Sequence, residues 1–93
     1  MNYLETVGHI NEILSNAGEH DTVRLINNAR IKGGGSAGEV LAIISSLLKV
    51  LEKKYPKIFS LIKDDAKILF NLSKQMGMRI IPNYNLLDEL DWE

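Results

Sequence analysis

Three glycines in this sequence have a spacing that other proteins use to bind phosphate groups. Gly33, Gly35 and Gly38 fit the pattern G-x-G-x-x-G, in which the missing side chains let backbone N–H groups approach the pyrophosphate of a dinucleotide. That chemistry needs a strand before the glycines and an acidic residue about 20 positions later. Here the preceding residues have a helical pattern, and residues 53–58 contain no acid. We therefore expect a connecting loop and no cofactor, and we leave open an anion held at the start of the following helix.

Histidine and glutamate side chains share one face of the first predicted helix. His9 lies there with Glu5 and Glu12, and these residue types can bind a metal ion. A catalytic metal site normally has three protein ligands and a second layer of hydrogen bonds that orients them. We therefore expect a solvated helix face and no metal.

Two neighbouring carboxylates, Asp64 and Asp65, lie within the fourth predicted helix. Neighbouring side chains on a helix point about 100° apart, so the two do not converge on one atom. Asp65 falls near the apolar stripe of its helix, where a carboxylate needs a partner. We expect either that a lysine or arginine from another helix pairs with it or that it lies at the edge of the stripe; a basic group on a partner protein is the alternative. We find no catalytic residue and predict that the protein is not an enzyme.

Charge is sorted along the chain although the total is only −1. Residues 49–79 carry eight bases and three acids, whereas residues 80–93 carry four acids and no base. The basic segment supports an alternative function as a nucleic-acid-associated regulator. However, it contains seven lysines and one arginine, and the acidic segment would compete for the same surface. We therefore favour the solvated faces of two amphipathic helices and do not expect nucleic acid as a partner.

The acidic C-terminal segment is the best candidate for a partner-binding site. Trp92, the only tryptophan, stands there among Asp88, Glu89 and Asp91. Tryptophan is enriched among the residues that anchor interfaces, so we select these four residues as partner-binding candidates. The alternative is that the apolar side chains of the segment fold back onto the protein while its acids pair with the basic helices.

The spacing of apolar residues predicts an all-α fold. Apolar side chains recur every three or four positions, as expected for helices that each bury one face. The predicted helices cover residues 2–17, 22–31, 37–55, 56–76 and 86–92. Residues 78–84 lack the pattern and predict an extended strap.

Residues at the ends of these segments support the helix boundaries. Gly18 is placed to end the first helix in a left-handed conformation, and Gly77 closes the fourth. Asp21 and Asn85 are candidate N-caps, and Ser36 begins a capping box with the glutamate three residues later. Pro56 suits the first position of a helix.

We predict a single helical domain over residues 1–93, with a four-helix bundle-like arrangement and a short C-terminal helix. The third and fourth helices should form the core pair, because their apolar stripes are the widest. Such stripes leave a homodimer as an open alternative.

The composition of the chain indicates where in the cell the protein is located. The chain has no cysteine, which excludes disulfides, zinc–thiolate sites and thiol nucleophiles and fits a reducing compartment. Residues 1–5 do not have the pattern of a secretory signal. No apolar run approaches the roughly 20 residues of a membrane span. We expect a cytoplasmic protein with no membrane segment.

Residues 28–41 read Asn-Ala-Arg-Ile-Lys-Gly-Gly-Gly-Ser-Ala-Gly-Glu-Val-Leu. This stretch resembles a pattern in small uncharacterised bacterial all-helical proteins. There, a helix ending in alanine is followed by glycine, a small hydroxylated residue, Gly-Glu and an apolar helix. The resemblance covers residues 10–75 and implies an all-helical fold. Some of these proteins are similar to immunity partners of bacterial toxins. We therefore expect a small protein-binding module, such as an inhibitor or immunity-type partner.

Overall fold

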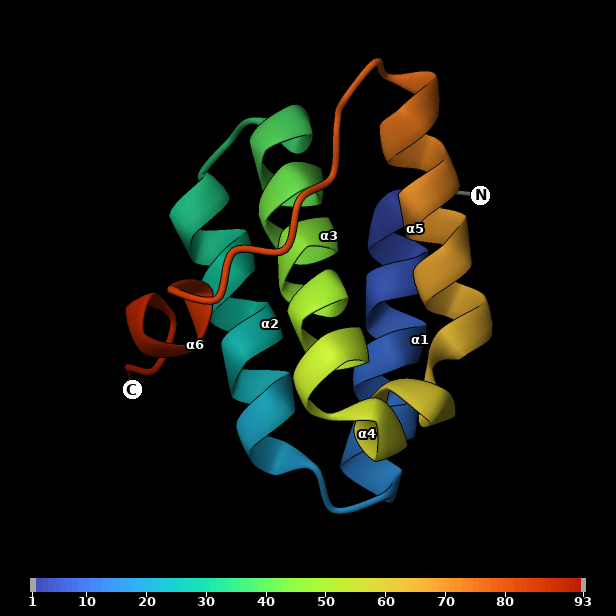
Figure 1. Ribbon diagram of the computed structural model, residues 1–93, viewed down its shortest axis with the longest axis vertical. Coiled ribbons are helices and arrows are strands. Elements are labelled where there is room, and N and C mark those ends of the chain that lie inside the picture. Colours follow the sequence, from blue (N-terminus) through green and yellow to red (C-terminus); the bar gives the residue numbers. More distant parts are fainter. Residues whose placement is uncertain (1, 93) are drawn as a thin grey trace.

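The computed structural model describes residues 2–92, and this part of the chain forms helices and no strands (Figure 1). The four long helices are α1 (Tyr3–Asn16), α2 (His20–Gly33), α3 (Ala37–Lys54) and α5 (Lys63–Gln75). The two short ones are α4 (Pro56–Leu61) and α6 (Leu86–Glu89). The predicted all-α fold is confirmed. None of these helices combines the length and the apolar character that crossing a bilayer requires.

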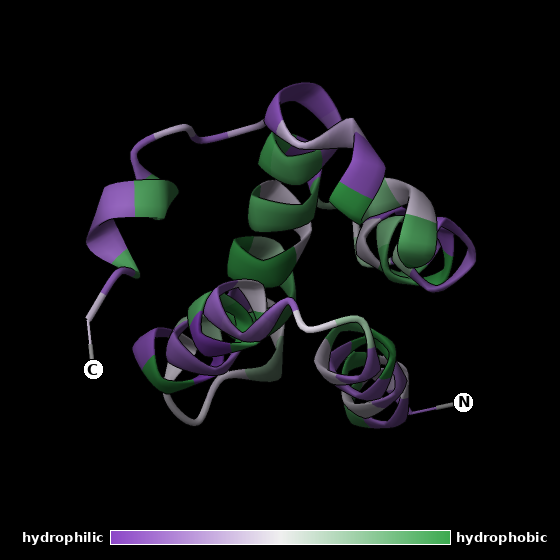
Figure 2. Ribbon diagram, turned by 90° about the horizontal axis from the view of Figure 1, so that it is seen from below, coloured by the Kyte–Doolittle hydropathy of each residue, from purple (hydrophilic) through white to green (hydrophobic). Residues whose placement is uncertain are grey.

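Helix α3 occupies the middle of the protein. It packs against α2 on one side and against α4 and α5 on the other (Figure 1). Figure 2 shows it as largely hydrophobic along its length. Ile44, Leu47, Leu48 and Leu51 are completely or almost completely buried there. Each such side chain contributes about 1.5–3 kcal/mol relative to an exposed one, so α3 is the main source of the core that holds the surface elements in place.

Glycine ends two of the long helices in the left-handed conformation. Gly18 follows α1 with φ 81°, and Gly77 follows α5 with φ 76°. After each glycine the next N–H reaches back to a carbonyl oxygen of the last helical turn: Glu19 to Leu14 at 2.8 Å and Met78 to Ser73 at 2.9 Å. The predicted ends at Gly18 and Gly77 are therefore confirmed, and the orphan carbonyls are satisfied.

The prediction of one continuous helix after Pro56 is wrong. The chain bends at Ile62 (φ −121°, ψ 14°), so that α4 ends and α5 begins there. Neither glycine nor proline marks the bend; Ile62 is buried at 1% exposure, and packing of this side chain holds the turn. As a consequence, Asp64 and Asp65 lie in the first turn of α5 rather than in mid-helix. Carboxylates are favourable there because the helix N-terminus is electropositive.

One predicted N-cap is wrong and another is correct in position only. Helix α2 begins at His20 and is flanked by Glu19, so Asp21 lies inside its first turn. Asn85 is the N-cap residue of α6, but its side chain makes no capping bond; instead the side chain of Asn83 accepts a hydrogen bond from the N–H of Asn85 at 3.1 Å. Ser36 does cap α3, since its Oγ accepts from the N–H of Glu39 at 3.3 Å.

Residues 78–84 form the predicted strap. The strap leaves the end of α5, crosses α3 and delivers α6 to the side of α2 (Figure 1). Met78, Ile80 and Pro82 are half-buried along it. Helix α6 is shorter than predicted, because residues 90–92 continue beside α2 without helical structure. The C-terminal segment, residues 86–92, therefore contacts a helix that is distant from it in the sequence.

Candidate protein-binding surfaces

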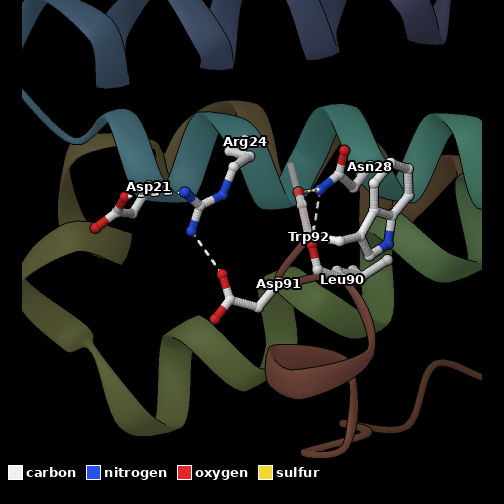
Figure 3. A network of polar contacts seen from close by, with 6 residues as sticks. All are labelled: Asp21, Arg24, Asn28, Leu90, Asp91 and Trp92. Carbon is white, nitrogen blue, oxygen red and sulfur yellow. Dashed lines mark hydrogen bonds and ion pairs between the residues drawn. The ribbon is translucent and has the colours of Figure 1, made fainter.

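A polar stripe on α2 holds the C-terminal segment. Arg24, Asn28 and Lys32 follow one another at intervals of four residues, which places them on the same helix face. The Asn28 side chain is buried at 5% exposure. Its amide nitrogen donates to the main-chain oxygen of Leu90 at 2.7 Å and to that of Trp92 at 2.5 Å (Figure 3). The middle residue of the stripe therefore binds the main chain of the segment.

Ion pairs flank this amide on both sides. Arg24 Nη2 lies 2.6 Å from Asp91 Oδ1 (Figure 3), and Lys32 Nζ lies 3.0 Å from Glu89 Oε2. All four side chains are partly exposed, so each pair contributes about 0.2–1 kcal/mol. The two pairs determine which acid faces which cation, so they contribute to the register of the segment on α2.

The segment folds back, but its acids do not pair with the basic helices of residues 49–79. Leu86 and Leu90 are buried, whereas Glu89 and Asp91 pair with α2. The expected pairing with the basic helices is wrong because the strap carries the segment across α3 and places it beside α2.

The four predicted partner-binding residues therefore divide into two pairs. Glu89 and Asp91 are engaged by α2. Asp88 is exposed and has no ion pair among residues 2–92, and Trp92 is 40% exposed. All four residues are exposed, but the carboxylates of Glu89 and Asp91 are already paired with cations of α2. The spacing of Arg24, Asn28 and Lys32 is the sequence pattern that accompanies this contact. It could not have predicted the contact by itself, because the sequence does not show that the acidic segment lies beside α2.

A groove lies between α3, α5 and the strap. Its volume is about 660 Å³, and cations and apolar groups line it together. The lining residues are Lys49, Lys67, Phe70, Asn71, Lys74, Met78, Arg79 and Ile80. We call this feature the basic groove. Half of the basic residues in the segment 49–79 line this groove.

Most of the charge in the basic groove is uncompensated. Lys49 is the exception: its Nζ lies 4.4 Å from the centroid of the Phe70 ring and 3.6 Å from Glu52 Oε1. Lys67, Lys74 and Arg79 have no acidic partner within the described part of the chain. Phe70 in turn stacks near Phe59, with ring centroids 6.4 Å apart. Three free cations therefore surround an apolar floor.

Asp65 has the cross-helix partner that its position requires, but the partner is a histidine. His9 Nδ1 on α1 lies 2.7 Å from Asp65 Oδ2 on α5. The expectation of a lysine or arginine was wrong, because α1 packs along α5 and brings His9 to this point. Residues 2–92 contain no group of three or more His, Asp or Glu side chains placed to hold a metal ion.

The glycine-rich loop has a structural explanation. Gly33 is the last residue of α2, and a Cβ atom there would lie 2.5 Å from Val40 Cγ2 of α3. Gly34 has φ 63° and turns the chain. Close packing of two helices and a tight turn thus account for the first two glycines.

The chain was compared with known proteins at three levels. No model of a protein family, no curated protein and no solved structure matches it.

Proposed function

We propose that this protein is a small protein-binding module, of the inhibitor or immunity type, and that its partner presents an acidic segment to the basic groove. The observation that carries the proposal is the set of three unpaired cations, Lys67, Lys74 and Arg79, around one groove. Cations grouped without internal partners attract a complementary acidic surface and speed its association.

The floor of the basic groove supports a protein partner. Phe70, Met78 and Ile80 are half-buried there, so that apolar surface is open at the centre with cations around it. Protein interfaces commonly combine an apolar centre with a polar rim. A partner segment with acidic and apolar side chains would satisfy both parts of this surface.

A nucleic-acid-associated regulator is the second candidate, because the same cations could contact phosphates. The surroundings of Phe70 favour it less. Lys49 lies over this ring and Phe59 is beside it, so the ring is not open as a platform for stacking a base. Arg79 is the only arginine in the groove.

A binding titration tests the proposal. The probes are a fluorescein-labelled decamer of glutamate and labelled 20-nucleotide DNA and RNA strands, each at low and moderate salt. We expect the peptide to bind, with an affinity that falls as salt rises, and we expect no binding of the nucleic acids at low salt.

Two variants with the same change of charge locate the site. Lys67→Glu with Lys74→Glu reverses two cations in the groove. Lys57→Glu with Lys63→Glu reverses two exposed lysines that do not line it. Only the first variant should lose the peptide. Equal losses in the two variants, or nucleic acids that bind more tightly than the peptide, would contradict the proposal.

A further inference from the structure

Helices α2 and α5 carry the same order of polar groups along one face. On α2 the order is Arg24, Asn28 and Lys32, and on α5 it is Lys67, Asn71 and Lys74. Each helix thus has a cation and an amide four residues later. A second cation follows the amide after four residues on α2 and after three on α5. With a rise of about 1.5 Å per residue, the outer cations are about 12 Å apart on α2 and about 10 Å apart on α5.

The structure shows what the α2 stripe binds. Its amide donates to two main-chain oxygens, and its cations meet two carboxylates of one short segment. That segment also buries Leu86 and Leu90. The α2 stripe therefore holds an acidic segment that carries leucines.

The α5 stripe is open. Asn71 is exposed and its side chain has no hydrogen-bond partner within residues 2–92, and neither lysine has an ion pair there. All three residues line the basic groove together with Phe70, which lies between them along the helix. The groove therefore provides an amide, two cations and an apolar floor at the same place.

We infer that the α5 stripe is a second peptide-binding site, which recognises an acidic, leucine-bearing segment of a partner protein. Asn71 donates to a main-chain oxygen of the segment, Lys67 and Lys74 bind its carboxylates, and a leucine rests against Met78 and Ile80 of the strap. This inference rests on the proposed function and adds to it the chemistry of the partner segment.

The occupant is a partner protein rather than a second copy of this chain. The segment of this chain with the right chemistry already uses its carboxylates on α2, through Glu89 and Asp91. A copy that offered it to α5 of another molecule would first have to give up those contacts and expose Leu86 and Leu90.

A peptide with the sequence of residues 83–92, Asn-Tyr-Asn-Leu-Leu-Asp-Glu-Leu-Asp-Trp, serves as the probe for the full chain. A second peptide replaces its three leucines by serine and keeps the charge. We expect the leucine peptide to bind at least about fivefold more tightly, since each buried leucine contributes to affinity. Asn71→Ala should weaken it about two- to tenfold through the lost hydrogen bond, and the Lys57→Glu, Lys63→Glu variant should not. Amide chemical-shift changes should lie on α5 and the strap.

The outcomes separate this inference from the proposed function. If the glutamate decamer binds the groove but the two peptides bind equally, or if Asn71→Ala has no effect, the inference fails and the proposed function stands. If none of the acidic peptides binds, both fail. Chemical-shift changes confined to α2 would place the probe at the first stripe and overturn the inference. A dimer in sedimentation that is lost in the Lys67→Glu, Lys74→Glu variant would make a second copy the occupant and overturn the assignment to a partner protein.

Discussion

The side-chain amide of Asn28 lies 2.7 Å from the main-chain oxygen of Leu90, and the two residues are 62 positions apart in the sequence. This hydrogen bond is buried and joins α2 to the C-terminal segment. It holds the C-terminal segment by its backbone, in addition to the burial of Leu86 and Leu90.

Asn28→Ala should lower the free energy of unfolding by about 1–3 kcal/mol, because the two hydrogen bonds that the amide donates to the main-chain oxygens of Leu90 and Trp92 are lost. Asn28→Asp should cost more, since a carboxylate would face those oxygens. Urea unfolding followed by circular dichroism measures both. The control is Asn16→Ala, an exposed asparagine at the end of α1. If Asn28→Ala unfolds with the midpoint of the control, the amide does not hold the segment.

The ion pair between Lys32 and Glu89 should show weak but real coupling. We expect a double-mutant cycle of Lys32→Ala and Glu89→Ala to give about 0.2–1 kcal/mol, because both side chains are partly exposed at a separation of 3.0 Å. The coupling should shrink in 1 M salt. A coupling energy of zero at low salt would show that this pair does not contribute to the register of the segment.

Gly33→Ala should destabilise the protein by about 1–3 kcal/mol through overpacking. The added Cβ would meet Val40 at 2.5 Å on its side chain and at 2.7 Å on its Cα, and backbone cannot move aside as a flexible side chain can. Gly35→Ala is the matched control, since a Cβ there meets nothing within 4 Å. Thermal unfolding of the two variants compares them directly, and equal midpoints would contradict the close packing of α2 on α3.

Gly8→Ala should stabilise the protein by about 0.5–1 kcal/mol. Gly8 is an exposed residue inside α1, and a Cβ there has no neighbour within 4 Å. Alanine reduces the backbone freedom of the unfolded chain and favours the helix. Chemical unfolding should show a higher midpoint with an unchanged denaturant slope. A lower midpoint would mean that α1 does not continue through residue 8.

Asp65→Ala should destabilise the protein more than Asp64→Ala, by about 0.5–1.5 kcal/mol. Both substitutions remove a carboxylate from the first turn of α5, so the effect of the helix dipole is similar. Only Asp65 contacts His9, at 2.7 Å. The difference between the two unfolding free energies therefore isolates the link between α1 and α5. Equal values would show that the link adds no stability.

Local sequence signals predicted much of the fold. Helical periodicity located the long helices, and the left-handed glycines at positions 18 and 77 ended two of them where expected. These features depend on residues close together in the chain. The bend at Ile62 was not predictable in this way, because no glycine, proline or capping residue marks it and tertiary packing of a buried isoleucine holds it.

The binding surfaces were harder to predict for the same reason. Residues 49–79 were identified as basic, but only the folded chain shows which of their cations share a groove and which are unpaired. Likewise, Asp88, Glu89, Asp91 and Trp92 were selected together from composition. The strap then separates them by bringing Glu89 and Asp91 to α2, a contact between residues more than 50 positions apart that no local pattern encodes.

The strap also has a consequence for hydrogen exchange. Because residues 78–84 have no regular structure, the C-terminal segment can leave α2 without unwinding any long helix. Its amide protons should therefore exchange through a local opening that has a much smaller free energy than global unfolding. During each such event the Arg24–Asn28–Lys32 stripe should be briefly vacant while α3 keeps its protection, so that both stripes are then exposed together.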